Sequence, residues 1–163
     1  MSKKYARIDY NSLFAKIIQQ FSLPLDSIHG PPHWARVEEF GLRLAHTTGA
    51  DVEVVRLFSL FHDAQRISES DDPEHGPRGA ILAAELRGTG YQIDDDRFGK
   101  LTYACTHHTY GPLTQDATIG TCWDADRLDL FRVSVIPDPR KLNTAAARDR
   151  EMITWALQYP RRS

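Results

Sequence analysis

The sequence predicts an all-α fold, a helical bundle of about seven helices, and three observations support it. Apolar residues recur at helical spacing in several segments, strand-like alternation is sparse, and capping residues stand at the ends of the periodic segments. The chain has 163 residues, 41% of them hydrophobic and 26% charged, which is enough to build one core. We therefore expect residues 1–163 to form a single domain.

Three helices are predicted in the N-terminal half. Residues from about 9 to 21 carry apolar residues at i, i+3 and i+4 spacing. The segment "GPPHWARVEEFGLRLAHTTG" opens on two prolines and ends at Gly49, the expected C-cap. Asp51 is placed to cap the apolar run "VEVVRLFSLFHD" that follows. The polar segment 68–76, "SESDDPEHG", is predicted to be a loop.

The C-terminal half contains four more predicted helices. The segment "PRGAILAAELRG" ends at Gly88, and "DDDRFGKLTYACTHH" begins on acidic residues that suit a helix N-terminus. After the loop "GPLTQD" comes the helix "IGTCWDADRLDLF", and "VIPDPRKLN" is a linker. Thr144 is expected to cap a last helix that runs to about Gln158. This helix would dock on the domain or on a second copy of the chain, so a homodimer is one expectation.

Composition argues against several classes of function. A formal net charge of −2 gives no basic surface for a nucleic-acid duplex. The N-terminus "MSKKYARIDY" has no apolar segment behind its basic residues, and no run approaches the roughly 18 apolar residues that a membrane span needs. Cys105 and Cys122 form no CxxC motif and are expected to be reduced core residues. We expect a cytoplasmic protein without a membrane partner.

Four ionisable side chains fall on the apolar stripes of four different predicted helices. Each lies three or four residues from large apolar residues, so each is expected to point inward. Any one of them alone suits a core residue satisfied by a hydrogen bond. Burying all four unpaired would cost about 2 kcal/mol or more apiece, and a shared metal ion avoids that cost. The four residues are His33, His62, His108 and Asp126.

Neighbouring residues add possible ligands off these stripes. Asp63 follows His62 and is rotated from it by about 100° around the helix, and His107 lies beside the stripe of its helix. Asp124 and Asp129 are expected to point away from the Asp126 stripe. Neutral imidazole and carboxylate suit zinc, manganese, iron and magnesium, so these residue types favour a divalent metal.

Three motifs together resemble those of the HD-domain superfamily of metal-dependent phosphohydrolases. They are "PPHWARV", "LFSLFHDAQR" and "DADRLDL", in the order H…HD…D, and the resemblance covers roughly residues 25–135. It implies an all-helical bundle in which His33, His62, Asp63 and Asp126 hold the metal. It also makes Asp126 the ligand rather than Asp124.

Additional histidines resemble those of the dinuclear branches, which include HD-GYP phosphodiesterases and myo-inositol oxygenase. His75 and the pair His107–His108 occupy the two extra positions, and His29 is a further candidate. The resemblance implies one or two divalent metals (manganese, iron, zinc, nickel or cobalt, with magnesium as another choice). Two departures argue against particular branches. Arg66 and Ile67 stand where nucleotidases carry an acid, and "TYGP" replaces "GYP".

The predicted function is hydrolysis of a nucleotide or a small phosphate ester or diester by a metal-activated water. Asp63 would orient the nucleophile, and Arg66, Arg78 and Arg127 would clamp phosphate through their planar guanidinium groups. Glu74, with Asp72 beside it, is a candidate general acid or base. The alternatives are a di-iron oxygenase of the myo-inositol oxygenase type and a non-catalytic metal-binding sensor.

Overall fold

The protein is all-helical in the computed structural model, which describes residues 4–160. Within these residues the β structure amounts to one isolated bridge between Arg87 and Tyr91. The all-α prediction is therefore confirmed. The α-helices are α1 Tyr10–Ile18, α2 Pro31–Thr48, α3 Val52–Phe61, α4 His75–Leu86, α5 Asp95–His107, α6 Ala117–Leu128, α7 Ala145–Arg148 and α8 Arg150–Gln158, with short 3-10 helices η1 Leu130–Val133 and η2 Pro139–Lys141.

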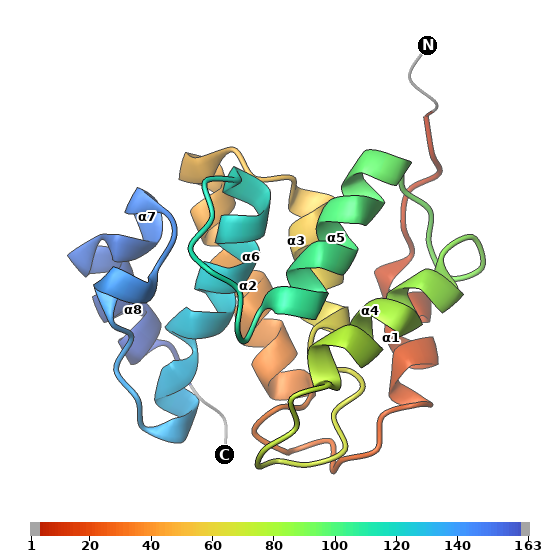
Figure 1. Cartoon of the computed structure of the whole chain (residues 1–163), viewed down its shortest axis with the longest axis horizontal. Coiled ribbons are helices and arrows are strands. Elements are labelled where there is room, and N and C mark those ends of the chain that lie inside the picture. Colours follow the sequence, from red (N-terminus) through yellow and green to blue (C-terminus); the bar gives the residue numbers. More distant parts are fainter. Residues whose placement is uncertain (1–3, 161–163) are drawn as a thin grey trace.

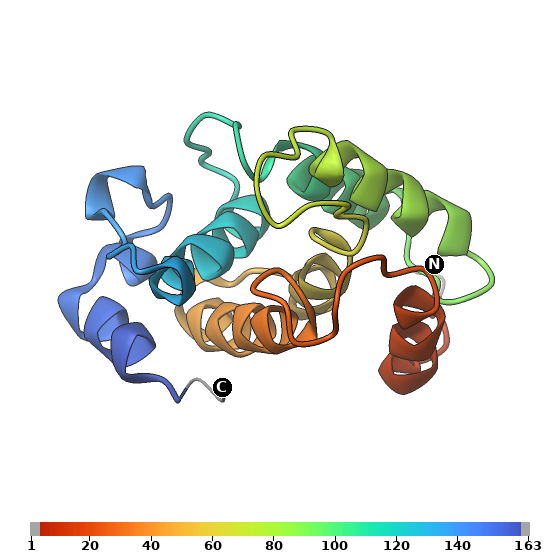
Figure 2. The same cartoon turned by 90° about the horizontal axis from the view of Figure 1, so that it is seen from below.

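Helix α3 forms the middle of the bundle. It packs against α2, α5 and α6, while α4 covers α5 and the short α7 and α8 cover α2 and α6 (Figure 1). Helices α2 and α6 lie side by side in both views (Figures 1 and 2). Seven of the ten α3 residues are buried, so the apolar run before His62 is explained by its central position. Among residues 4–160, no helix has the length and apolarity that a membrane crossing requires.

Most predicted helix ends are confirmed. Gly49 ends α2 in the left-handed conformation with φ of 73°, which glycine adopts without steric cost. The Asp51 side chain accepts a hydrogen bond from the backbone N–H of Val54 at 3.1 Å and so caps α3. The polar loop ends earlier than predicted, because α4 begins at His75.

The predicted single helix from Thr144 to about Gln158 is wrong, because Asp149 interrupts it. Asp149 is extended, with ψ of 131°, and its carboxylate accepts the backbone N–H of Glu151 at 2.8 Å. An aspartate side chain offers the backbone an alternative to continued helix, so a new helix starts here. The resulting α8 docks through Met152 and Ala156, which are buried.

Asp124 fastens the C-terminal segment to α6. Its buried carboxylate accepts the backbone N–H groups of Asn143 and Thr144 at 2.7 and 2.8 Å, together with both of their side chains. Asp124 is therefore a structural anchor, which agrees with the prediction that it points away from Asp126.

Candidate metal centre

The predicted ligands come together at the ends of several helices. His33 lies in the first turn of α2, His62 and Asp63 directly follow α3, and Asp126 lies in the last turn of α6. His75 is the first residue of α4, and His108 directly follows α5. All six are buried except Asp126, whose side chain is 15% exposed.

The first triad consists of His33, His62 and Asp63. The Nε2 atoms of its two histidines are 3.1 Å apart, and Asp63 Oδ2 lies 3.4 Å from His33 Nε2 and 3.5 Å from His62 Nε2. Asp126 Oδ1 adds a second carboxylate oxygen at 3.1 Å from His33 Nε2. These are four ligand atoms of types that divalent transition metals prefer.

The second triad consists of Asp63, His75 and His108. Its two Nε2 atoms are 2.9 Å apart, and Asp63 Oδ1 lies 3.2 Å from His75 Nε2 and 3.5 Å from His108 Nε2. Asp63 thus presents one carboxylate oxygen to each triad. The arrangement matches a pair of neighbouring metal positions that share one carboxylate.

The four imidazoles share one pattern of hydrogen bonding. On each ring, Nδ1 faces an oxygen that can only accept, so each Nδ1 must carry the proton. The acceptors are Asp129 Oδ2 for His33 (2.7 Å), the Phe58 carbonyl for His62 (3.0 Å), the Asp72 carbonyl for His75 (2.5 Å) and the Cys105 carbonyl for His108 (2.8 Å).

In a neutral ring this pattern leaves the lone pair on Nε2, the atom that faces the neighbouring histidine. The Nε2 atoms of His33 and His62 face each other at 3.1 Å, and those of His75 and His108 face each other at 2.9 Å. Two neutral rings in this arrangement repel each other unless a proton or a metal ion lies near both Nε2 atoms. The residues therefore fit one or two metal ions well.

Burial and charge act together on this cluster. Burial lowers the pKa of His33, but the hydrogen bonds that its ring donates to the Asp126, Asp129 and Asp63 carboxylates outweigh burial and bring that pKa to about 9. Without a metal ion the His33 ring is therefore protonated near pH 7, and a bound metal ion would replace the proton on Nε2. Burial raises the pKa values of the Asp63 and Asp126 carboxyls, yet the surrounding histidines hold both well below their ordinary range. The cluster thus retains its carboxylate charge and attracts cations.

Asp129 corrects the prediction that it points elsewhere. Helix α6 ends at Leu128, and Asp129 has φ of −92° and ψ of 11°, so its side chain leaves the helical direction. It is fully buried, with Oδ2 on His33 Nδ1 and Oδ1 on the Nε of Arg36 at 2.7 Å. A carboxylate behind a histidine ligand fixes the ring and makes it more basic.

A cleft of about 300 Å³ opens onto both triads. Asp63, His75, His108 and Asp126 form its floor. Arg66 also lines it, and its buried Nε lies 3.6 Å from Asp63 Oδ1 with no hydrogen-bond partner in the described part of the chain. The remaining lining residues are His29, Thr109, Arg127, Leu130, Arg132 and Val133.

Three predicted site residues belong neither to the triads nor to the lining of this cleft. His107 packs against the Tyr103 ring on the solvent-exposed face of α5, whereas the next residue, His108, is buried. Glu74 is exposed at the start of α4. Arg78 is held away by Asp72, whose two carboxylate oxygens each lie 2.7 Å from Arg78 Nη2.

His29 lines the cleft without joining either triad. Its Nδ1 lies 3.4 Å from Glu69, and the same carboxylate accepts the backbone N–H of Ile28 at 3.0 Å. Burial lowers the pKa of His29 to about 4, so the ring is neutral near pH 7. His29 is suited to a hydrogen bond with a bound molecule.

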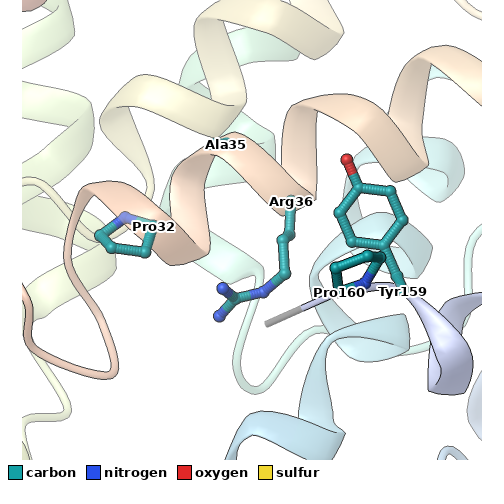
Figure 3. Close-up of a pocket in the computed structure, with 5 residues that line it drawn as sticks. All are labelled: Pro32, Ala35, Arg36, Tyr159 and Pro160. Carbon is teal, nitrogen blue, oxygen red and sulfur yellow. The ribbon is translucent and has the colours of Figure 1, made fainter. Parts of the chain in front are cut away.

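A separate pocket of about 480 Å³ lies on the outer side of α2 (Figure 3). Pro32, Ala35, Arg36, Tyr159 and Pro160 line it, so it lacks the histidine and carboxylate ligands of the cleft. We therefore place the candidate functional site in the cleft over the two triads.

Sequence reasoning missed Arg132 and Thr109, which line the cleft, and the supporting role of Asp129. The Arg132 guanidinium is anchored by the carbonyls of Ile28 and Asp129, both at 3.0 Å. Arg132 lies in η1, which directly follows the last HD motif, and this closeness in sequence could have identified Arg132 as a cleft residue.

The fold resembles that of a solved protein. The match covers 90% of this chain and 84% of the other, with a TM-score of 0.70 and 24% sequence identity. That crystal structure is of a predicted HD superfamily hydrolase from an uncultured Thermotogales bacterium. No protein-family model matches the sequence, and no curated protein matches it. The likeness establishes the helical fold that the HD motifs predicted.

Proposed function

We propose that this chain is a metal-dependent phosphohydrolase of the HD type that acts on a nucleotide or a small phosphate ester. The strongest support is the orientation of the four histidine rings. Four histidines each use Nδ1 to donate to an oxygen and turn Nε2 toward one shared carboxylate, Asp63. Such a cluster binds divalent cations, and the cleft above it has cationic walls.

Two positions are proposed for the metal. His33, His62, Asp63 and Asp126 would hold one ion, and Asp63, His75 and His108 the other. When bound, divalent ions at such a site polarise a phosphoryl oxygen and lower the pKa of water. Asp63 would be common to both positions and would fix the place of the reacting group between them.

Arginines would hold the substrate phosphate. Arg66 supports this role because it lines the cleft and its buried Nε, 3.6 Å from Asp63 Oδ1, has no hydrogen-bond partner in residues 4–160. Its Nη1 is already anchored by the carbonyls of Ser68 and Ser70 at 2.9 and 3.1 Å. An anchored guanidinium with a vacant donor binds an anion with little loss of side-chain entropy.

The proposed reaction is hydrolysis of a P–O bond. The oxygen of water forms a new bond to phosphorus, the bond to the leaving oxygen breaks, and the leaving oxygen gains a proton. Arg66, Arg127 and Arg132 would stabilise negative charge on the phosphoryl oxygens. The neutral His29 ring would accept or donate a hydrogen bond at the leaving group or at water.

Elemental analysis combined with a phosphate-release assay tests the proposal. We expect wild type to bind about two manganese or comparable ions per chain and to release phosphate from general substrates. His62→Ala should lose metal and activity. His107→Ala is a matched control, because His107 is an exposed histidine in the same region.

Each alternative function predicts a different outcome of these assays. A protein that binds no metal, with His62→Ala unchanged in every assay, would contradict the proposal. Bound iron with oxygen consumption and no phosphate release would favour an oxygenase. Bound metal without turnover on any phosphate or with oxygen would favour a sensor.

A further inference from the structure

A second cleft adjoins the cleft over the metal cluster. It has a volume of about 290 Å³ and shares Thr109 and Arg127 with the first cleft. Its other lining residues are Gly111, Leu113, Arg140 and Lys141. A molecule bound at the metal cluster can therefore extend past Arg127 into a second compartment.

Cations dominate the second cleft. Arg127, Arg140 and Lys141 line it, and none of the described lining residues is Asp or Glu. Asp138 offsets part of this charge, because it pairs with the Arg140 guanidinium at 2.9 Å. The positive character is local, since the whole chain has 20 Lys and Arg against 22 Asp and Glu. The cleft therefore favours an anionic group.

Arg127 is fixed where the two clefts meet. Its Nη1 donates to the carbonyl of Lys141 at 3.0 Å, and the guanidinium carbon lies 5.8 Å from the ring centre of Trp123. That hydrogen bond uses one of the five N–H donors of a guanidinium. The same bond joins α6 to η2, the short helix that carries Arg140 and Lys141.

We propose that the substrate carries two phosphate groups, one at the metal cluster and the other in the second cleft, where Arg127, Arg140 and Lys141 bind it. This inference rests on the proposed phosphohydrolase function and narrows its substrates to doubly or multiply phosphorylated compounds. The second phosphate is not the one cleaved. Instead, its binding positions the scissile phosphate over Asp63.

Binding of matched compounds to manganese-loaded protein tests this inference by calorimetric titration. The sets are fructose 6-phosphate with fructose 1,6-bisphosphate, and AMP with ADP and adenosine 3′,5′-bisphosphate. In at least one set we expect a doubly phosphorylated member to bind about tenfold more tightly or better. The preference should vanish in Arg140→Ala/Lys141→Ala. ADP against adenosine 3′,5′-bisphosphate distinguishes a phosphoanhydride from two separate esters.

A second double variant provides the control. Lys4→Ala/Arg7→Ala removes the same charge from exposed positions before α1 and should keep the preference. A compound that is hydrolysed during the titration is compared by kcat/KM instead. Equal affinity within every set, or a preference that survives Arg140→Ala/Lys141→Ala, overturns the second phosphate site. So does the absence of binding by any doubly phosphorylated compound.

The two proposals fail in different ways. A protein that prefers doubly phosphorylated compounds but hydrolyses none keeps the second phosphate site and loses the hydrolase function. A protein that hydrolyses monophosphates and shows no such preference keeps the hydrolase function and loses the second site.

Discussion

The two triads share Asp63 but are supported by different chemical groups. In the first triad, the Asp129 carboxylate holds the His33 ring, and Asp126 adds a second carboxylate. In the second triad, backbone carbonyls hold His75 and His108, and Asp63 supplies the carboxylate. The first triad therefore concentrates more negative charge in a more deeply buried place.

The difference extends to the cleft. His75 and His108 line it, whereas the two histidines of the first triad do not. A divalent ion gains more from two carboxylates than from one, and a buried site exchanges its ion less readily. We infer that the first triad provides the tighter metal position and that the second lies closer to substrate.

The largest expected effect comes from the residue common to both triads. Asp63→Asn removes the charge that both positions use, so metal content should fall from about two ions to none. Elemental analysis after dialysis measures this, together with phosphate release. Asp71→Asn changes an exposed acid of the following loop and should leave both values unchanged. An Asp63→Asn protein that retains one ion would show that the triads are independent.

Removing one histidine from each triad should separate the two positions. His75→Ala should hold about one ion in the first triad, since Asp126 and Asp129 remain. His33→Ala should weaken binding at the first triad and leave the weaker second site. Calorimetric titration with manganese gives the number of ions and the affinity of each. Equal losses of metal affinity in both variants would contradict the inferred difference between the two triads.

Asp129→Asn should produce a smaller change at the first triad. Loss of the charge behind a histidine ligand typically costs about 10–100-fold in metal affinity. Asp124→Ala is the matched control, because Asp124 is another buried acid near the end of α6. It should reduce the free energy of unfolding by about 3 kcal/mol without changing metal affinity. Manganese titration should show the larger loss of affinity in Asp129→Asn, and thermal unfolding should show the larger loss of stability in Asp124→Ala.

The smallest effect concerns pH. His33 has a pKa of about 9, above its ordinary 6.5, so in metal-free protein it contributes stability below about pH 6.5 that is lost as pH rises through 9. The lowered pKa values of Asp63 and Asp126 contribute stability above about pH 3.8 that is lost in acid. Because metal replaces protons, the gain in Tm on adding manganese should be larger near pH 9 than near pH 6.

Helix periodicity was enough to predict the bundle and the inward direction of His33, His62 and His108. These residues lie in or beside regular helices, where spacing determines direction. The same reasoning placed Asp129 wrongly, because it assumed that α6 continues beyond Leu128. Element boundaries depend on caps and tertiary contacts, which sequence spacing does not contain.

Arginine roles were harder to predict than histidine roles. Arg66 and Arg127 do line the cleft, whereas Arg78 turns to Asp72 and the unpredicted Arg132 takes a place in the wall. A long side chain reaches whichever carboxylate or carbonyl its loop brings near, and that choice is made by tertiary structure. At Gly79, by contrast, the backbone explains the residue type. A Cβ there would approach the Phe61 carbonyl oxygen to 2.3 Å, so glycine allows α4 to lie close to the end of α3.

Most of the residues that would contact a substrate lie in other structural elements than the candidate metal ligands. The candidate metal ligands lie in or at the ends of packed helices. Thr109, Arg132, Val133, Arg140 and Lys141 lie in loops and short 3-10 helices, while Arg127 is the exception and lies in α6 beside Asp126. Substitutions in loops disturb packing less than substitutions in the core. Substitutions at these loop positions are therefore expected to change which molecules the cleft accepts while leaving the candidate metal ligands in place.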